Sequence, residues 1–195
     1  MNAAVLQRRP ARPASPGPTP VIQTGRLTLR PHRLADADAI AQSLSDFAVT
    51  RMMARVPTPY LRQDALDWLV PRAGGLGDDW ALAVTEGDDV HIGVVSLELR
   101  NGRWHLAYWL NRYFWRRGIM SEAVAAAVER FGRRMPETPV HSGVFADNPA
   151  SLKLQEKLGF SITGCTEVYS FARNTMVPHL ETVLPPGGLR LTHAA

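Results

Sequence analysis

The amino-acid sequence predicts a mixed α/β (α+β) fold, in which helices cover the faces of a mixed β-sheet. Three observations predict it. Residues 26–30 alternate polar and apolar side chains with the period of a strand, an Asn-Gly pair at 101–102 separates two strand-like runs, and helical periodicity begins after Gly118. Because 195 residues is a usual size for one domain, we expect a single domain with the order β-α-α-β-β-β-α-β-α-β-β.

The first third of the chain combines one strand with two helices. The strand at 26–30 ends at Pro31, whose ring removes a backbone hydrogen-bond donor. Residues 34–47 place their apolar side chains on one helical stripe, and a second amphipathic helix runs over 63–70. Prolines break the chain between these helices, and a glycine-rich stretch ends the second one.

The middle of the chain predicts an antiparallel meander of three strands, near 80–86, 90–100 and 103–110. A type I′ turn needs positive φ at both central positions, and Asn-Gly supplies it most readily. A two-residue turn at Asn101 and Gly102 therefore pairs Glu98 with His105 on one face of the hairpin.

The second half predicts two helices and three strands. Helical spacing resumes after Gly118. Another helix is delimited by Asn148 as its N-cap, Pro149 at its first position and Gly159 as its stop. The strands lie near 139–146, 161–171 and 177–184.

The positive charge of the chain is confined to its ends. Of the formal net charge of +4, three arginines in residues 1–20 contribute +3 and Arg190 contributes +1, which leaves residues 21–184 neutral. We therefore expect residues 1–20 to form a disordered Arg/Pro-rich tail, 21–184 to form the domain and 185–195 to form a flexible tail. A neutral body argues against a specific nucleic-acid-binding protein.

Composition excludes other classes as well. Cys165 is the only cysteine, so neither a disulfide framework nor a cysteine-based zinc site is expected, and a reducing compartment, the cytoplasm, is favoured. The histidines do not cluster with metal-ligand spacing, so we expect no metal. No apolar run reaches the roughly 18–20 residues that cross a bilayer, so we expect no membrane partner.

The segment 108–123 has the pattern of an anion site. A strand ends at Leu110, a short loop contains Arg116, Arg117 and Gly118, and a helix follows at once. Such a unit directs free backbone N–H groups and the positive end of a helix dipole at one point, where a phosphate or pyrophosphate can bind. The alternative is an ordinary strand–helix connection with solvated arginines, and these residues alone leave both interpretations open.

Several motifs occur together in order. They are T-G-R-L-T-L-R-P at 24–31, A-Y-W-L at 107–110, W-R-R-G-I-M-S-E-A at 115–123 and N-P-A-S-L-K-L-Q-E-K-L-G-F at 148–160. With these motifs the chain resembles the GNAT superfamily of N-acetyltransferases, in the RimJ/RimL-type branch of ribosomal-protein N-terminal acetyltransferases. The resemblance covers residues 24–184 and implies the GNAT acyl-CoA N-acyltransferase fold, with acetyl-CoA as co-substrate.

The resemblance also implies a cofactor site. Trp109 and Leu110 become the backbone neighbours of the pantetheine arm and the thioester, and Asn148 and Ser151 face the cofactor from the next helix. The implied pyrophosphate loop consists of Arg116, Arg117, Gly118, Ile119, Met120 and Ser121.

Two departures from the family pattern concern this loop. The family often has Gly where Arg116 stands and a small residue where Met120 stands, but backbone N–H groups do the binding, so the site is retained. Tyr60 and Arg62 lie in the segment where family members usually contact the acceptor, and they are the candidates for substrate binding.

His105 and Glu98 are the candidate base and its positioning partner. The hairpin register places them opposite each other, and a carboxylate beside an imidazole orients the ring and raises its pKa. In the resembled family the position of His105 often carries a Glu proposed as base or amine ligand. The alternative is a cross-strand ion pair on an exposed face, worth about 0.2–1 kcal/mol.

Ser151 is the candidate donor to the leaving thiolate. Many GNAT enzymes use a Tyr in this helix, but that position is occupied here by Gln155, which cannot act as an acid. Ser151 lies one helical turn nearer the helix N-terminus and can donate instead. Alternatively Ser151 is an ordinary surface serine, and Asn148 is a helix cap in either case.

The sequence thus predicts an acetyl-CoA-dependent N-acetyltransferase that acetylates a primary amine, either a protein N-terminus or a small amine, by direct transfer in a ternary complex. A homodimer is compatible with this interpretation. The alternative is a non-catalytic acyl-CoA-binding protein of the same fold, which the Gln155 position favours.

Overall fold

The computed structural model describes residues 15–75, 77 and 79–190. The strands are β1 (Ile22–Gln23), β2 (Leu27–Pro31), β3 (Trp80–Glu86), β4 (Val90–Arg100), β5 (Arg103–Leu110), β6 (Val140–Phe145), β7 (Ser161–Ser170) and β8 (Thr175–Leu184). The helices are α1 (Ala37–Leu44), α2 (Phe47–Thr50), α3 (Arg62–Leu69), α4 (Ile119–Arg134) and α5 (Pro149–Leu158), with short 3-10 turns η1 (Leu34–Asp36), η2 (Ala73–Gly75) and η3 (Arg112–Phe114). The mixed α/β fold predicted above is confirmed.

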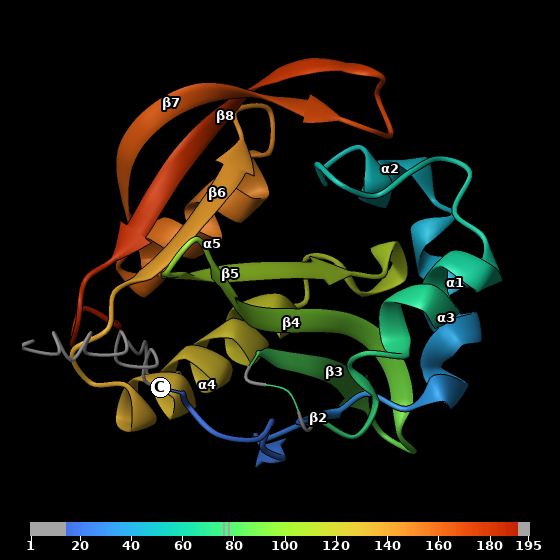
Figure 1. Ribbon diagram of the computed structural model, residues 1–195, viewed down its shortest axis with the longest axis horizontal. Coiled ribbons are helices and arrows are strands. Elements are labelled where there is room, and N and C mark those ends of the chain that lie inside the picture. The colour runs from blue at the N-terminus through green and yellow to red at the C-terminus, as the bar shows by residue number, and fades with distance from the viewer. Residues whose placement is uncertain (1–14, 76, 78, 191–195) are drawn as a thin grey trace, which may run out of the picture.

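The eight strands form one sheet in the order β1-β2-β3-β4-β5-β6-β8-β7 (Figure 1). All pairs are antiparallel except β5 and β6, which run parallel. That parallel pair is joined only at Trp104↔Val140 and His105↔His141. Beyond these residues the two strands separate, so the sheet opens in its middle.

The predicted central meander is confirmed in its bounds and its register. Arg100 pairs with Arg103 and Glu98 pairs with His105, as a two-residue turn requires. Asn101 and Gly102 both have positive φ, of 50° and 74°. These are the angles that a type I′ turn needs, which explains why an Asn-Gly pair stands there.

The predicted helix at 34–47 is wrong as a single element. The segment divides into η1, α1 and, after a break, α2. The break lies at Asp46, which has extended backbone angles and whose side chain accepts a hydrogen bond from the Ala48 amide. Asp46 therefore acts as the N-cap of α2, and a cap residue cannot continue the preceding helix.

Two apolar cores lie on opposite faces of the sheet. Alternate residues of β4 and β5 point to opposite sides, as in any strand. One face packs against α4, where Phe131 contacts Trp80 edge-on with ring centroids 5.7 Å apart. The other face packs against α1 and α3, where Val94 and Trp109 join the buried residues of these helices. The opening between β5 and β6 thus lies between two rigid layers.

Both ends of the described chain pack more closely than the sequence predicts. Within the expected tail at 1–20, Gly17 accepts a hydrogen bond from Trp80 Nε1 at 2.9 Å, and Pro16 accepts one from Arg134 Nη1 at 2.7 Å. At the other end, the Arg190 amide donates to the Leu158 carbonyl at 3.0 Å. The remaining expected tail residues, 1–14 and 191–195, lie outside the described residues.

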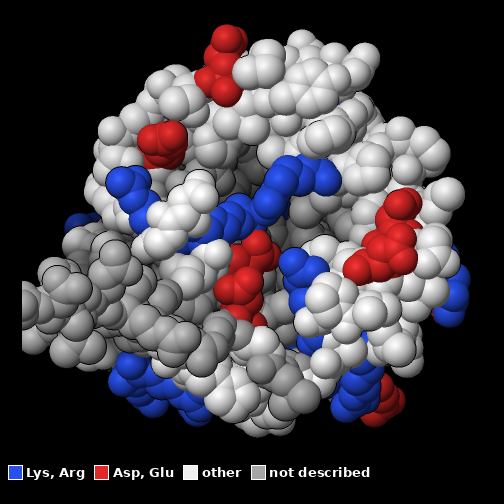
Figure 2. Space-filling view, viewed as in Figure 1, with Lys and Arg blue, Asp and Glu red and all other residues white. Residues whose placement is uncertain are grey.

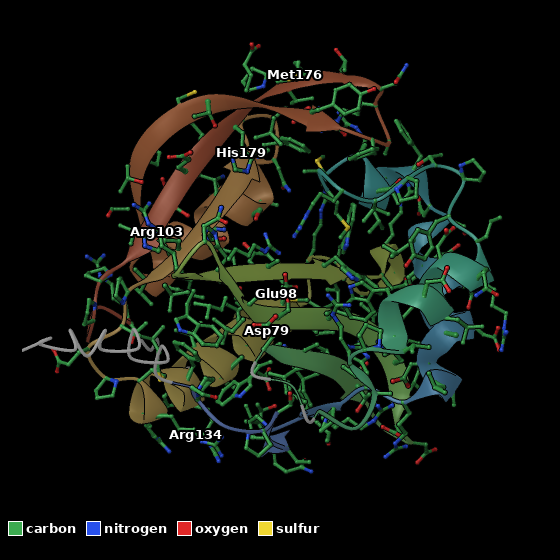
Figure 3. The ribbon with its side chains drawn as sticks, in the orientation of Figure 1. Asp79, Glu98, Arg103, Arg134, Met176 and His179 are labelled. Atoms are coloured by element: carbon green, nitrogen blue, oxygen red, sulfur yellow. The ribbon has the colours of Figure 1, made fainter. Side chains whose placement is uncertain are left out.

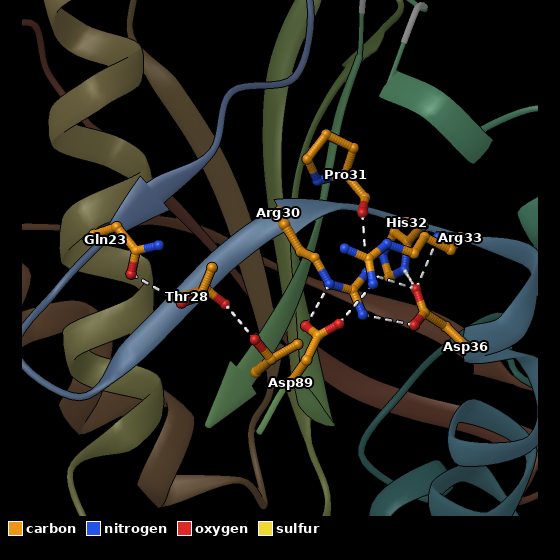
Figure 4. A network of polar contacts seen from close by, with 9 residues as sticks. Gln23, Thr28, Arg30, Pro31, His32, Arg33, Asp36 and Asp89 are labelled. Carbon is orange, nitrogen blue, oxygen red and sulfur yellow. Dashed lines mark hydrogen bonds and ion pairs between the residues drawn. The ribbon is translucent and has the colours of Figure 1, made fainter. Parts of the chain in front are cut away.

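A buried ion network anchors β2 to the first helical turn and to the β3–β4 connection (Figure 4). The Arg30 guanidinium donates to both carboxylate oxygens of Asp36, at 3.0 and 2.8 Å, and to Asp89 at 2.7 Å. Burial alone would raise the pKa of Asp36, but contacts with His32 and Arg30 hold that pKa far below its usual range. The network fixes one flank of the sheet that supports the opening.

Candidate functional site

A cavity of about 1490 Å³ fills the opening between β5 and β6. It extends from the N-terminus of α4 to the segment between α2 and α3, and Figure 2 shows the surface hollowed where charged side chains of both signs meet. Figure 3 places Glu98 toward the centre of this face and His179 on the β8 wall. The cavity therefore has two ends, one at α4 and one at α2 and α3.

The end at α4 is built from backbone. Gly118 is the N-cap of α4 with φ of 70° and makes no side-chain cap, and Arg116 also has positive φ, of 62°. The first hydrogen bond back to the cap comes from the Glu122 amide to the Gly118 carbonyl, at 3.1 Å. The amides of Ile119 to Ser121 precede it, so they have no acceptor inside the helix. Free amides at a helix N-terminus fit a phosphate group.

A brace from β2 holds this loop. Glu122, in the first turn of α4, accepts hydrogen bonds from Thr24 Oγ1 at 2.6 Å and from Arg26 Nε at 2.8 Å. Arg26 also donates to the Arg117 carbonyl at 2.8 Å. The T-G-R motif before β2 thereby fixes the backbone of a loop more than ninety residues away.

The cavity includes most of the predicted cofactor residues. Those that line it are Trp109, Leu110, Arg116, Gly118, Ile119, Met120, Ser121, Asn148 and Ser151. Arg117 does not line it, because its guanidinium lies 3.4 Å from Glu86 and over the Phe114 ring. The two adjacent arginines thus differ in direction, which the sequence does not reveal.

Asn148 performs the predicted cap. Its side chain accepts a hydrogen bond from the Ser151 amide at 3.2 Å, and Gly159 ends the helix with φ of 102°. Both Asn148 and Ser151 also line the cavity. The cap and the cavity role therefore coexist in the same residues.

Tyr108 is a polar residue of the site that the sequence analysis misses. Its hydroxyl lies 2.6 Å from Ser151 Oγ and accepts a hydrogen bond from Gln155 Nε2 at 3.2 Å. Burial raises the pKa of Tyr108, although hydrogen bonds from these two neighbours oppose it. The signal in the sequence is the alternation of Leu106, Tyr108 and Leu110, which places a tyrosine on the helix-facing side of β5.

Gln155 holds the Tyr108 hydroxyl in place through a network of hydrogen bonds. Its Nε2 also donates to Ser142 Oγ at 2.9 Å, and its Oε1 accepts from Thr182 Oγ1 at 2.6 Å. Ser142 in turn donates to the Leu106 carbonyl at 3.0 Å, on the strand that carries Tyr108. The position that lacks the family tyrosine thus holds another tyrosine in place.

The expected effect of Glu98 on His105 is wrong. Glu98 accepts from Ser96 Oγ at 2.9 Å and from Arg100 Nε at 3.0 Å, so its carboxylate is turned to its own strand. Burial lowers the pKa of His105, the positive charges of Arg100 and His141 lower it further, and Glu98 opposes them only weakly. Cross-strand register places Glu98 opposite His105, but the Glu98 carboxylate binds the Arg100 guanidinium instead. A lowered pKa keeps the imidazole neutral near pH 7.

Of the two residues predicted to bind the acceptor, Tyr60 and Arg62, only Tyr60 lines the cavity. Tyr60 lines the cavity, and burial together with the charge of Asp64 raises the pKa of Tyr60 to about 12. Arg62 pairs instead with Asp38 of α1, at 2.6 Å, and does not line the cavity. Tyr60 therefore remains a candidate for acceptor contact, whereas the structure directs Arg62 elsewhere.

The β7–β8 hairpin closes the top of the cavity against the segment after α2, where the two approach in Figure 1. The Phe171 amide donates to the Ala54 carbonyl at 2.9 Å, and Arg173 Nε donates to the Arg51 carbonyl at 2.6 Å. Asp147 accepts from Arg173 at 2.8 Å and from Arg51 at 3.1 Å. These contacts arch over the cavity end at α2 and α3.

The described part of the chain has neither a metal-binding cluster nor a membrane-crossing helix. No group of three or more His, Cys, Asp or Glu side chains there is arranged to hold a metal ion. Within the same residues, every helix is too short or too polar to cross a bilayer.

Comparison with known proteins gives one family. The acetyltransferase (GNAT) domain matches residues 26–161. An uncharacterised N-acetyltransferase of Bacillus licheniformis, p20, is 29% identical over 161 residues, which cover 80% of this chain and 90% of that protein. An uncharacterised N-acetyltransferase of Bacillus subtilis, YoaA, is 26% identical over 162 residues, covering 80% of this chain and 91% of that protein.

Solved structures share the fold at low identity. A GNAT-family acetyltransferase from Bacillus anthracis superposes with a TM-score of 0.75 at 17% identity, covering 86% of this chain and 99% of that one. The ribosomal-protein-S5-alanine acetyltransferase of Vibrio fischeri gives 0.72 at 17%, covering 88% and 100%. The microcin C7 self-immunity acetyltransferase MccE, solved with acetyl-CoA and AMP, gives 0.69 at 16%, covering 83% and 93%.

Proposed function

Because the chain belongs to the GNAT acetyltransferase family, a family of acetyl-CoA-dependent acyltransferases, we propose that it acetylates a primary amine by direct transfer in a ternary complex. The observation that carries this proposal is the opening between β5 and β6, which ends at the free amides of α4. Phosphates at these amides direct the thioester along the opening, toward the point where the two strands meet.

The cofactor end binds through backbone. The amides of Gly118 to Ser121 hold the pyrophosphate, and Arg116 adds positive charge from the same loop. Trp109 and Leu110 lie along the opening, where β6 no longer pairs with β5. The Leu110 carbonyl accepts a hydrogen bond from Trp115 Nε1 at 2.8 Å, and the Leu110 amide is the proposed donor to the thioester oxygen.

His105 takes the proton from the attacking amine. It is the last residue of β5 that pairs with β6, so it stands at the closed end of the opening. A protonated amine has no free electron pair, and a neutral imidazole accepts its proton directly or through water. The amine nitrogen then bonds to the acetyl carbonyl carbon, and the carbon–sulfur bond breaks.

Ser151 and Tyr108 stabilise the leaving thiolate together. Their hydroxyls share a hydrogen bond of 2.6 Å on the α5 side of the cavity. Because one hydroxyl of the pair can donate outward while accepting from the other, the pair offers a proton to the sulfur. Tyr108 therefore stabilises the leaving thiolate, the role that a tyrosine at the position of Gln155 has in many family members.

The alternative is a non-catalytic acyl-CoA-binding protein of the same fold. Its support is Gln155 at the usual position of the tyrosine. The Tyr108–Ser151 pair weakens that support, because it supplies hydroxyl donors beside the same helix. Binding of acetyl-CoA cannot separate the two interpretations, whereas turnover can.

The acceptor is a protein N-terminus or a small amine. The fold shared with the ribosomal-protein-S5-alanine acetyltransferase favours an N-terminus, in keeping with a RimJ/RimL-type branch. The arch of the β7–β8 hairpin over the cavity favours a small molecule. A single cysteine, Cys165, fits a reducing location in the cytoplasm.

The test is release of the CoA thiol with acetyl-CoA and a panel of primary amines. The panel contains short peptides with varied N-termini, amino acids, polyamines and aminoglycosides, and the control omits the amine. We expect at least one amine to raise thiol release above the control, with an acetylated product of matching mass. A thermal shift with acetyl-CoA but no turnover with any amine would favour the binding protein.

A further inference from the structure

Three arginines from separate segments meet at the acceptor end of the cavity. Arg55 follows α2, Arg72 follows α3, and Arg100 ends β4, and all three line the cavity. They surround one partly buried carboxylate, Glu98, which is labelled in Figure 3. Local charge at this cluster is therefore positive.

The carboxylate of Glu98 is already occupied. One oxygen accepts from Ser96 Oγ at 2.9 Å and the other from Arg100 Nε at 3.0 Å. Arg55 Nη2 stays 3.8 Å from that second oxygen, beyond hydrogen-bond distance. Among the described residues Arg55 makes no hydrogen bond, so its five donors are free to bind a ligand.

Arg72 is held in place by one nitrogen of its guanidinium, and its other nitrogens can donate to a ligand. Its Nη1 donates to the Trp68 carbonyl at 2.8 Å, and the guanidinium lies over the Trp68 ring at 4.7 Å. Its charge reaches both Arg55 and Glu98. Burial is the main cause that lowers the pKa of Arg55, the charges of Arg100 and Arg72 lower it further, and Glu98 raises it. Three arginines around one carboxylate leave positive charge in excess.

Other acids nearby do not compensate this excess. Asp64 accepts from the Leu61 amide at 2.7 Å and caps its own helix. Asp67 accepts from Gln63 Nε2 at 2.8 Å on the same helix. Neither is among the charges that act on Arg55, which are Arg100, Glu98 and Arg72. The cluster of Arg55, Arg72 and Arg100 thus carries two positive charges beyond the one that Glu98 balances.

We propose that this arginine cluster binds a carboxylate or phosphate group on the acceptor, so that the substrate is a small amine that also carries an anion. Planar guanidinium groups recognise both anions through paired hydrogen bonds. The assignment rests on the proposed function, and it names the substrate class for that site.

The hairpin register sets the size of this acceptor. Glu98 at the cluster lies directly opposite His105, the proposed base. Directly opposed residues of antiparallel strands have Cα atoms about 4.5–5.5 Å apart. An anion at the arginines and an amine at His105 therefore belong to one small molecule, such as an amino acid or an aminoalkyl phosphate. Polyamines, which are cations, are repelled by the same cluster.

The experiment compares matched acceptors at saturating acetyl-CoA. Each amino acid is paired with its own carboxamide, which has the same size and amine but no charge, and with an aminoalkyl phosphate and a diamine of similar length. We expect kcat/KM for the better anionic acceptor to exceed that of the carboxamide at least tenfold. The carboxylate and phosphate arms show which anion the cluster prefers.

The variant Arg55→Gln tests the cluster itself. Its exposed guanidinium makes no hydrogen bond among the described residues, so the fold is retained. We expect about a tenfold loss of kcat/KM for the anionic acceptor and no change for the carboxamide. The control is Arg133→Gln, an exposed arginine on α4 outside the cavity, which should alter neither.

Two results overturn the assignment while leaving acetyl transfer intact. One is equal kcat/KM for each acid and its carboxamide, and the other is a preference for diamines or for neutral peptide N-termini. An acidic peptide preferred over every small acid also overturns the small-molecule assignment. Thiol release with no amine at all is a different outcome, because it rejects the proposed function rather than the arginine cluster.

Discussion

The two ends of the cavity are built from different kinds of groups. The α4 end presents the backbone amides of one continuous loop, whose shape is set by positive φ at Arg116 and Gly118. The acceptor end presents side chains from separate segments, with Arg55, Glu98 and His105 as examples. A backbone site depends on a few neighbouring residues, whereas a side-chain site depends on how distant segments pack. Under the proposed function, the first end would serve the common cofactor and the second would set the acceptor.

The largest effect is expected at the acceptor end. His105→Gln removes the proposed base, and general-base catalysis contributes about 10²–10⁴ in rate, so kcat should fall roughly a hundredfold. Affinity for acetyl-CoA should be unchanged, since the loop at Gly118 is untouched. Steady-state kinetics and a binding titration measure the two effects.

The pH profile of kcat sharpens this prediction. Because the pKa of His105 is lowered, the wild-type rate should fall only as pH drops below about 6.5, where the imidazole becomes protonated. His141 lowers this pKa by its charge, so His141→Gln should move the acid limb to higher pH with the plateau retained. If the acid limb of the pH profile were unchanged in His105→Gln, His105 would not be the base.

The next effect belongs to the α4 end. Gly118→Val places a β-branched residue at φ of 70°, a conformation that costs about 1–2 kcal/mol for residues with a Cβ. We expect acetyl-CoA to bind about tenfold more weakly. The control is Gly132→Ala in the same helix, where an added Cβ meets nothing within 4 Å, and acetyl-CoA should bind it as it binds the wild type.

If Gly118→Val bound acetyl-CoA normally, the backbone loop would not be the phosphate site. The selectivity between acceptors should be equal in this variant and the wild type, because the arginine cluster is unaltered. A change in acceptor preference would contradict the separation of the two ends.

An effect of similar size, on kcat instead of on binding, is expected between the ends. Tyr108→Phe removes one hydroxyl of the pair with Ser151 but leaves the serine, and a lost hydrogen bond of about 1.5 kcal/mol predicts roughly a tenfold lower kcat. Tyr113→Phe is the matched control, since Tyr113 is 87% exposed. An acyl-thioester with a better leaving thiol should recover much of the lost rate in Tyr108→Phe. No recovery would indicate a purely structural tyrosine.

The smallest effect tests the brace. Glu122→Gln weakens the contacts to Thr24 and Arg26, and a partly exposed ion pair is worth about 0.2–1 kcal/mol. Acetyl-CoA should therefore bind about threefold more weakly, with kcat for saturating substrates retained. The measurement is a titration of both proteins at two salt concentrations, because salt should reduce the difference. Equal affinities at low salt would show that the loop holds its shape without β2.

The accuracy of prediction from sequence differs between the same two regions. The turn at Asn101 and Gly102 set the register of Glu98 and His105 correctly, because turn type and register are local properties. The same register could not show that Arg100 and Ser96 would take the Glu98 carboxylate. Opposed positions permit a contact, but the side chain turns to its strongest partner.

The missed and misplaced residues have the same cause. Tyr108 pairs with a serine forty-three positions later, and Arg62 pairs with Asp38 on another helix. Arg117 lies outside the cavity, with its guanidinium 3.4 Å from Glu86, whereas Arg116 lines the cavity. Each outcome depends on the approach of elements that are distant in the chain, and hydrophobic periodicity does not specify it.

By itself the sequence determined most of the elements, the hairpin register, the cap of α5 at Asn148 and the loop before α4, since φ/ψ preferences, turn chemistry and periodicity act within a few residues. Only the tertiary structure decided where β5 and β6 separate, which tyrosine faces Ser151 and which arginines surround Glu98. The physical reason is that side-chain contacts form between segments that packing of the two cores brings together.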